Sequence, residues 1–257
     1  MDAQTKAFPP PTQFLETMVA LNPRVAAFDC DGTLWSGDVG ERFFDWELRS
    51  AELVPASVEA AMRARYADYK RGEVEETTMC GEMVTMHKGI PEIRLMDASI
   101  RFFDQFFVEL IFPEMRELVH RLQENGCEIW AVSSSNEWVI RAGMRHFGIP
   151  DNRILAAKVE VDNGIATDRL IRVPSGPGKP EALREAARKP IDAAFGNSRW
   201  DAEMLAMAKY AIAVNPNPDL EAKARERGWR VYFPEGTRSG SENASNHQGR
   251  KDTPSTP

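Results

Sequence analysis

The chain is poor in the residues that build disulfides and zinc sites. Its 257 residues hold three cysteines, an odd number at wide spacing, which are Cys30, Cys80 and Cys127. This spacing fits neither a disulfide framework nor a C-x-x-C metal site, so we expect buried, inert thiols. The four histidines lack the i, i+4 spacing of zinc-binding helices, which argues against a zinc enzyme.

Long apolar runs and excess positive charge are also missing. No apolar run approaches the roughly 18 to 20 residues that a membrane helix needs, and the N-terminal region holds Pro9, Pro10 and Pro11 rather than a secretory signal. The formal net charge of -7 argues against DNA or RNA as the main ligand. We therefore expect a cytoplasmic protein that binds neither nucleic acid nor a membrane, and the sequence gives no oligomeric state.

The composition, 42% apolar and 28% charged residues, is typical of a globular protein with one large domain or a core with an insertion. Residues 1–22 are expected to form a loose lead-in. The segment 36–112 carries apolar residues at helical spacing between Gly and Pro, which predicts a small helical domain. The polar segment 236–257, rich in Ser, Asn, Pro and Gly, is expected to be disordered.

Residues 23–35 and 113–235 have a different pattern. A short strand at 25–29 is followed, after the helical insertion, by alternating helices and strands, with a hairpin turn predicted at Asn163-Gly164. Such alternation predicts an α/β fold in which a mainly parallel, Rossmann-like sheet is covered by helices on both faces. Ligands of such sheets bind at the carboxyl ends of the strands.

Polar side chains gather at those expected strand ends. The first strand ends in DCDGT at 29–33, the second in SSSN at 133–136 and a late strand in NSRWD at 197–201, while Lys179 lies in a Gly/Pro loop. Because the carboxyl ends of parallel strands meet at one edge of a sheet, we expect these groups to converge there.

The pattern predicts a magnesium and phosphate site. Side chains alternate along a strand, so Asp29 and Asp31 face the same way, and their repulsion calls for a cation. Mg²⁺ binds about six oxygens and commonly takes one or two carboxylates together with substrate phosphate. Asn197 and Asp201 are the candidates to complete its protein ligands.

The expected phosphate contacts come from three loops. Ser133 and the backbone N–H of Ser134 lie just before a helix, where an anion is stabilised. Lys179 adds positive charge, and the break at Gly32 and Thr33 gives a phosphate group close access.

Other interpretations fit these motifs less well. An EF-hand starting at Asp29 would need Gly and Glu where the chain has Leu34 and Gly40, and a Walker loop ending at Lys179 would need Ser or Thr where it has Pro180. A plain Asx turn explains a lone D-x-D-G, but it does not explain three further strand-end groups in the right order.

These motifs resemble those of the haloacid dehalogenase-like hydrolase superfamily, in its phosphoserine-phosphatase-like branch with a helical cap after the first strand. The first motif is DCDGT, the second VSSS, the third Lys179 and the fourth GNSRWD. The resemblance implies a phosphatase acting on a small phosphorylated metabolite. Asp29 would be the nucleophile that forms an aspartyl-phosphate, and Asp31 the general acid and base.

The resemblance also implies a ligand set. Mg²⁺ would be bound by Asp29, by the backbone carbonyl of Asp31 and by the fourth-motif side chains. Where this branch usually has Gly-Asp, the chain has Gly196-Asn197, so weaker magnesium affinity is expected. Because of Asn197, a second possibility is a phosphate-binding regulatory module without turnover. A third is an enzyme that transfers the phosphoryl group to an acceptor other than water. Asp31 favours phosphoryl transfer over dehalogenation.

The insertion suggests an aminated substrate. In relatives of this branch an acidic residue nine positions after the nucleophile binds the substrate ammonium, and here it is Asp38, which equally suits a helix N-cap. The arginine that binds the substrate carboxylate there would align near Gly81, which argues against phosphoserine. The aromatic residues near Asp38 form either a cage for an alkylammonium group or ordinary core. They are Trp35, Phe43, Phe44 and Trp46.

Overall fold

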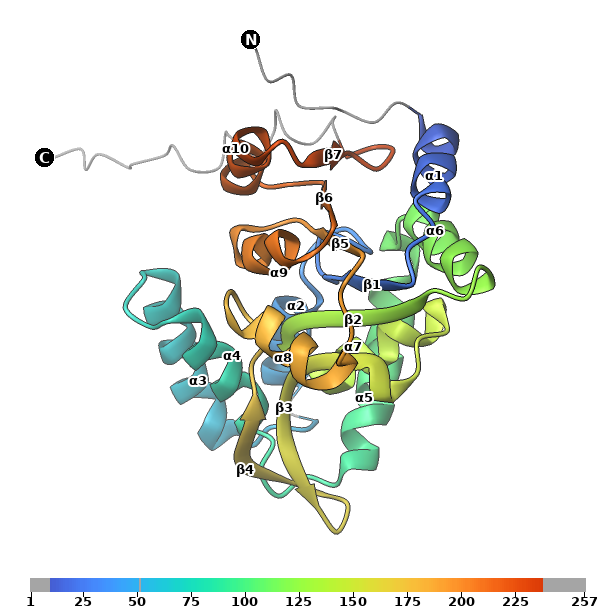
Figure 1. The fold of residues 1–257 in the computed structure, drawn as a ribbon. Helices are drawn as coiled ribbons and strands as arrows, with labels where there is room; N and C mark the ends of the chain where they lie inside the picture. Colours follow the sequence, from blue (N-terminus) through green and yellow to red (C-terminus); the bar gives the residue numbers. More distant parts are fainter. Residues whose placement is uncertain (1–9, 51, 238–257) are drawn as a thin grey trace, which may run out of the picture.

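The computed structural model describes residues 10–50 and 52–237, in which seven strands form one sheet (Figure 1). The strand order is β4-β3-β2-β1-β5-β6-β7, and every neighbouring pair is parallel except the β3–β4 hairpin. The predicted α/β fold with a mainly parallel sheet is confirmed. The strands are β1 (Val25–Phe28), β2 (Glu128–Asn136), β3 (Ile154–Asp162), β4 (Ile165–Arg172), β5 (Ala193–Gly196), β6 (Tyr210–Val214) and β7 (Arg230–Tyr232).

Both faces of the sheet are covered by helices, and the central strand β1 is apolar and buried at every position. In β1, Ala26 and Phe28 join one buried cluster, while Val25 and Ala27 join the other. The first cluster includes side chains of α1 (Pro11–Ala20), α6 (Pro113–Glu124) and α7 (Glu137–Met144). The second includes side chains of α8 (Gly178–Ala187), α9 (Ala202–Met207) and α10 (Pro218–Arg227). This two-sided burial explains the continuous apolar runs of the strands.

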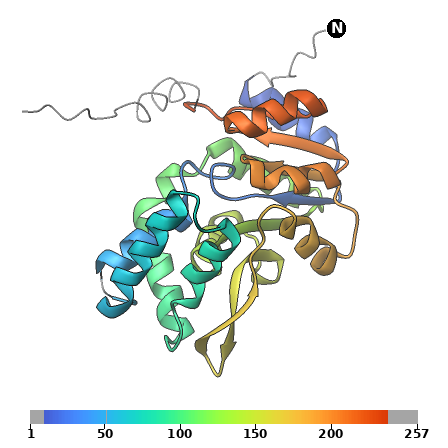
Figure 2. The same cartoon turned by 90° about the vertical axis from the view of Figure 1, so that its left-hand side faces the viewer.

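The segment between β1 and α6 is helical, as its spacing predicts. It contains α2 (Val39–Ser50), α3 (Ala56–Lys70), α4 (Glu76–Thr85), α5 (Glu92–Phe106) and a short 3-10 helix at Val108–Leu110. Figure 2 shows these helices grouped beside the sheet. Helix α4 packs against the β3–β4 hairpin, where Gly81 faces Leu170. The boundaries of a separate helical domain at 36–112 stay a prediction.

The expected loose lead-in is wrong for residues 11–20, which form α1. Phe14, Leu15 and Met18 are buried, and the ring of Phe14 stacks on Tyr232 with 3.7 Å between ring centroids. A Pro at N1 and one apolar stripe are enough to form a short helix once β7 and α6 provide a surface to bury it. Of the predicted disordered tail, 236–257, only Gly236 and Thr237 lie within the described residues, where they form part of a turn.

Two features of the chain bear on its environment. None of the described helices is long and apolar enough to cross a membrane. The three cysteines are free thiols, as expected, but only Cys30 and Cys127 are buried. Cys80 is half-buried on α4, where burial raises the pKa of its thiol to about 12 and keeps it protonated.

Candidate active site

The carboxyl ends of β1, β2 and β5 open onto one cavity of about 470 Å³, which α2, α3 and α4 close from the other side. The sheet side and the helix side contribute different residues. The sheet side is lined by Asp29, Asp31, Gly32, Ser133, Ser134, Ser135, Lys179 and Asn197. The helix side is lined by Asp38, Gly40, Glu41, Phe43, Phe44, Glu47, Tyr66, Tyr69, Lys70, Glu76, Met79, Cys80 and Met83. The predicted strand-end groups therefore do converge.

Asp29 lies at the end of β1 with both carboxylate oxygens fixed. The Lys179 Nζ donates to Oδ1 at 2.7 Å, and the Thr33 hydroxyl donates to Oδ2 at 2.7 Å. Thr33 is fully buried and does not line the cavity. Its predicted phosphate contact is therefore wrong. The Thr33 hydroxyl instead orients Asp29, the carboxylate four residues earlier in the chain.

Lys179 is the cation that Asp29 shares with Asp201. Its ammonium donates to Asp29, to Asp201 Oδ1 at 2.5 Å and to the Val132 carbonyl oxygen at 3.1 Å, and the residue is buried. Burial alone would lower the pKa of Lys179, but the two carboxylates raise it, so the ammonium stays charged. Burial and the Asp201 carboxylate raise the pKa of Asp29 to about 7, which Lys179 only partly offsets.

Asp201 holds other residues in place rather than facing the cavity. Its Oδ1 bonds Lys179, while its Oδ2 accepts from the backbone N–H groups of Asn197 and Ser198 and from the Ser198 hydroxyl. Asp201 is fully buried and is not part of the cavity wall. The prediction that it ligates a metal is therefore wrong for this arrangement, because Asp201 does not border the cavity in which a metal would bind. Gly196 fits beside it because a Cβ would lie 2.5 Å from the Cβ of Asp201.

Asp31 is held by three donors. Its Oδ1 accepts from Trp35 Nε1–H at 2.8 Å and from the Val39 N–H at 2.6 Å, and its Oδ2 meets the Ser135 hydroxyl at 2.7 Å. Burial, with the nearby Asp38 carboxylate, raises the pKa of Asp31 to about 8. Since Oδ1 already accepts two N–H groups, a proton on Asp31 belongs on Oδ2. The group can therefore donate a proton near neutral pH.

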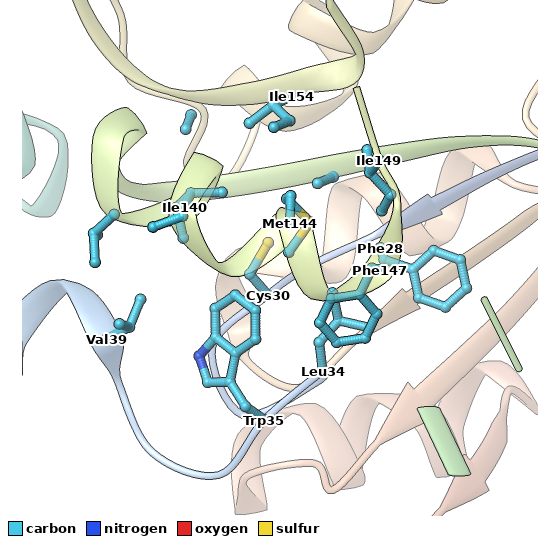
Figure 3. Packing of buried hydrophobic residues seen from close by; sticks show 14 of the residues in the cluster. Phe28, Cys30, Leu34, Trp35, Val39, Ile140, Met144, Phe147, Ile149 and Ile154 are labelled. Atoms are coloured by element: carbon cyan, nitrogen blue, oxygen red, sulfur yellow. The ribbon is translucent and has the colours of Figure 1, made fainter. Parts of the chain in front are cut away.

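Trp35 does not line the cavity, which contradicts its predicted role as a substrate contact. The side chain is fully buried and lies among Cys30, Leu34, Met144 and Phe147 (Figure 3). Its one polar atom, Nε1, is used to bond Asp31. An indole is largely apolar with a single donor, so burial in the core and a fixed hydrogen bond satisfy it together.

The remaining predicted phosphate contacts, Gly32, Ser133 and Ser134, all line the cavity. Gly32 has φ +74°, and a Cβ there would lie 1.8 Å from the Asn197 amide nitrogen, so only glycine fits between the first and fourth motifs. Its N–H already donates to the Gly37 carbonyl oxygen at 3.1 Å. Gly32 therefore allows close approach rather than donating to a phosphate.

The oxygen atoms on the sheet side of the cavity suit one cation that prefers oxygen ligands, such as Mg²⁺, although the protein offers few of them. Among the described residues no group of three His, Cys, Asp or Glu side chains is placed to hold a metal. Asp29 and Asn197 line the cavity, and the carboxylate oxygens of Asp31 are engaged, which leaves its backbone carbonyl. Two buried carboxylates share one ammonium, so one negative charge is left uncompensated. That excess charge fits a cation that takes its other ligands from phosphate and water.

Asp38 and the aromatic residues have mixed roles. The Asp38 Oδ1 accepts from the Glu41 N–H at 2.7 Å, so the expected N-cap of α2 is confirmed, while the residue also borders the cavity. Phe43 and Phe44 line the cavity, but Trp46 packs in the core and does not. The proposed cage therefore lacks both of its tryptophans.

Several cavity residues had not been predicted. Glu47 forms a buried pair with His87, and the Glu76 carboxylate accepts from the Ser175 hydroxyl at 2.6 Å. Glu47 occupies an apolar-spaced position of α2, four residues after Phe43, and that misplaced charge is the only sequence signal it gives. Ser135 belongs to the second motif, VSSS, and no function was predicted for it, but its hydroxyl bonds Asp31.

Comparisons with known proteins agree with this geometry. The sequence signature of the haloacid dehalogenase-like hydrolases matches residues 26–206. The chain is 27% identical to a histidinol-phosphatase of Neisseria meningitidis over 217 residues, which are 80% of this chain and 97% of that protein. It is 29% identical to a phosphoserine phosphatase of Mycobacterium tuberculosis over 135 residues, 50% of this chain and 43% of that protein.

Solved structures share the fold. A protein of unknown function from Bordetella pertussis matches with a TM-score of 0.69 and 23% identity, covering 81% of this chain and 97% of that chain. A probable phosphoserine phosphatase from Vibrio cholerae matches with a TM-score of 0.61 and 19% identity, and the match covers 90% of this chain and 69% of that chain. The predicted resemblance is confirmed, and the chain belongs to the haloacid dehalogenase-like hydrolase family.

Proposed function

We propose that this hydrolase is a phosphatase that removes the phosphoryl group from a small aminated metabolite through an aspartyl-phosphate on Asp29. The observation that carries the proposal is the pairing of two carboxyl groups with different environments at one cavity. Burial raises the pKa of Asp29 to about 7, but the contact with the Lys179 ammonium partly offsets this and keeps the value below that of Asp31. Asp31 meets neutral donors only, and burial raises its pKa to about 8. One group is suited to attack and the other to donate a proton.

The chemistry divides into two steps. An Asp29 oxygen attacks phosphorus, the bond from phosphorus to the alcohol oxygen breaks, and Asp31 gives its proton to that oxygen. Asp31, now ionised, takes a proton from water, whose oxygen attacks the phosphorus and releases phosphate and free Asp29. Lys179 neutralises the phosphoryl oxygens and Ser133 and Ser134 border them, which is electrostatic stabilisation by groups that are fixed before the reaction.

A magnesium ion is part of this proposal. Asp29, the Asp31 backbone carbonyl and the Asn197 side chain are the protein groups that would hold it, and it would supply positive charge to the transferring phosphoryl group. With one carboxylate, one carbonyl and one amide as ligands, weak affinity for Mg²⁺ stays our prediction. Titration calorimetry with Mg²⁺ measures it, and tight binding would contradict it.

The cavity wall supports an aminated substrate. Its helix side carries Asp38, Glu41, Glu47 and Glu76 against a single lysine, Lys70. An excess of carboxylates favours a cationic group. The names of the relatives, histidinol-phosphatase and phosphoserine phosphatase, point to substrates that carry an amine. At Gly81 a glycine packs against Leu170, so the position aligned with the arginine of the phosphoserine enzymes offers no partner for a carboxylate.

The decisive experiment measures phosphate release from p-nitrophenyl phosphate, histidinol phosphate, phosphoserine and phosphocholine, with Mg²⁺ and with a chelator. We expect turnover that requires Mg²⁺, and Asp29→Asn should lower it at least a thousandfold. No release from any ester by the wild type would overturn the proposal and favour the phosphate-binding module that Asn197 suggests. Adding an alcohol acceptor and analysing products separates hydrolysis from transfer.

A further inference from the structure

One member of a buried acid–imidazole pair, Glu47, lines the cavity away from the four sequence motifs, and its partner His87 lies behind it. Glu47 Oε1 and His87 Nε2 lie 2.6 Å apart, and the side chains are 1% and 0% exposed. His87 Nδ1 lies 3.1 Å from the Val84 carbonyl oxygen, which can only accept, so Nδ1 carries a proton. The contact between Nε2 and Oε1 then holds one further, shared proton, and the imidazole fixes the position of the carboxylate.

The second oxygen of Glu47 is the one that remains for a ligand. Within the described residues Oε2 has no hydrogen-bond partner. It is also not one of the fully buried polar atoms without a partner, so it keeps some exposure, and Glu47 lines the cavity. Fold stability does not account for the pair, because a buried ion pair is often no better than apolar residues of the same volume. Its position at the cavity wall does account for it.

Helix α2 sets the distance between this pair and the reaction centre. The N–H of Val39, the first residue of α2, bonds Asp31, and Glu47 follows eight residues later, about 12 Å along the helix axis. Gly40, Phe43, Phe44 and Glu47 all line the cavity, and their spacing of three, one and three residues places them on one face of the helix. The cavity therefore runs along α2 from Asp31 to Glu47, with apolar rings between.

We propose that Glu47, oriented by His87, is a specificity residue that accepts a hydrogen bond from a cationic nitrogen at the far end of an elongated substrate. This inference rests on the proposed function, whose site supplies the phosphate end. The other carboxylates of the helix side have different partners: Asp38 caps α2, Glu41 lies 3.5 Å from the exposed Lys70 Nζ, and Glu76 bonds Ser175. Glu47 differs in being fixed by a fully buried imidazole. Phe43 and Phe44 would pack against the aliphatic or ring portion that links the two ends.

Binding rather than turnover tests the inference. Calorimetry with Mg²⁺ would compare ω-aminoalkylphosphonates of increasing chain length with alkylphosphonates of the same lengths, which are phosphate ester analogues without a cleavable oxygen bridge. For the wild type we expect the amine to strengthen binding at least tenfold at one preferred length, and not at the shortest. Equal affinity for amine and alkyl ligands at every length would overturn the inference, and this measurement needs no variant.

The variant Glu47→Gln removes the charge and keeps the shape. Its amide can donate to His87 Nε2, so the pair stays hydrogen-bonded while the cavity oxygen becomes neutral. We expect affinity for the preferred aminoalkylphosphonate to fall about tenfold and affinity for the alkyl ligand to stay unchanged. Glu82→Gln on α4, whose carboxylate pairs with Arg65 away from the cavity, is the matched control and should change neither.

Two further outcomes separate the proposals. If Glu41→Gln removes the preference for the amine and Glu47→Gln does not, the assignment to Glu47 is wrong. If the wild type binds aminoalkylphosphonates selectively but releases no phosphate from any ester, the phosphatase proposal fails and this one stands. If it hydrolyses p-nitrophenyl phosphate but shows no preference for an amine, only this inference fails.

Discussion

The two walls of the cavity are built in different ways. On the sheet side the polar groups bond one another: Lys179 joins Asp29 to Asp201, Thr33 fixes Asp29, and Trp35 helps to fix Asp31. On the helix side several lining side chains are half-exposed or exposed to solvent. They include Asp38 and Glu41 near the start of α2, and Tyr66, Tyr69 and Lys70 on α3. One wall is a closed hydrogen-bond network, and the other is a set of separate contacts.

This contrast assigns different tasks to the two walls. A network in which each member fixes the next is suited to hold reacting groups in position before the substrate binds. Separate contacts on helices are suited to recognise the variable part of a substrate, since each can be replaced without disturbing the rest. We therefore expect substitutions in the sheet-side network to affect every substrate, and substitutions on the helix side to affect substrates selectively.

The largest effect is expected for Lys179→Met, which removes the centre of the sheet-side network. Asp29 and Asp201 would remain buried without their ammonium, and the Val132 carbonyl oxygen would lose a donor. Breaking a buried pair in this way costs about 3–5 kcal/mol. Urea unfolding should show that loss, and phosphate release from every ester should fall at least a thousandfold.

Lys189→Met is the matched control, because Lys189 pairs with Glu128 on the surface of the same α/β region. It should change the free energy of unfolding by less than about 1 kcal/mol. Near wild-type stability and activity in Lys179→Met would show that the three buried groups do not depend on one another, and the contrast between the walls would not hold.

A smaller and more selective effect is expected for Trp35→Phe. The change removes one of the two N–H donors to Asp31 Oδ1 and leaves the Val39 N–H and the Ser135 hydroxyl in place. If Trp35 keeps Asp31 oriented as a proton donor, alkyl phosphates, whose leaving alcohols need a proton, should lose about tenfold to a hundredfold in kcat. p-Nitrophenyl phosphate, which has a good leaving group, should lose little.

A purely structural role for the indole would give a different pattern. General damage to the fold would lower turnover of both esters equally, and the ratio between them would stay that of the wild type. Trp130→Phe provides the comparison, since that indole is also buried and also donates to a carboxylate, Glu128, but lies in the other apolar cluster. It should leave the ratio unchanged.

The strand-end motifs could be predicted from the sequence because each lies within a few residues of a short apolar strand. Asp29, Asp31, Ser133 and Asn197 line the cavity for that reason, whereas Lys179 reaches it from the first turn of α8. The roles of Thr33 and Asp201 were not, because sequence order does not show which oxygen of a carboxylate is already engaged. Thr33 bonds Asp29 and Asp201 bonds Lys179, each from the side away from the cavity.

Residues that act through long-range packing were missed. Glu47 and His87 are 40 positions apart, and their contact depends on how the turn that follows α4 lies against α2. The burial of Phe14 depends in the same way on Tyr232, which lies at the opposite end of the described chain. Local spacing predicts a helix and its apolar face, but not the element against which that face packs.

Stability should depend on pH in a different way after Asp31→Asn, a change that also removes the proposed proton donor. Burial raises the pKa of Asp31 from 3.8 to about 8 in the folded protein, so between these values the folded state holds a proton that the unfolded state releases. The free energy of unfolding therefore decreases as the pH rises from about 4 to about 8 and loses no more above that pH. An asparagine has no proton to release, so the stability gained by the variant should grow across this window.

Melting temperatures measured from pH 5 to pH 9 in a chelator test this, with each kcal/mol gained worth about 2–4 °C for a chain of this size. The control Asp168→Asn removes an exposed carboxylate whose pKa is lowered by Lys88, and it should show no gain at high pH. A variant that is less stable than the wild type at pH 8 would mean that Trp35, Val39 and Ser135 bind Asp31 as an anion. Asp31 would then be a third charged carboxylate beside Asp29 and Asp201 rather than a protonated group.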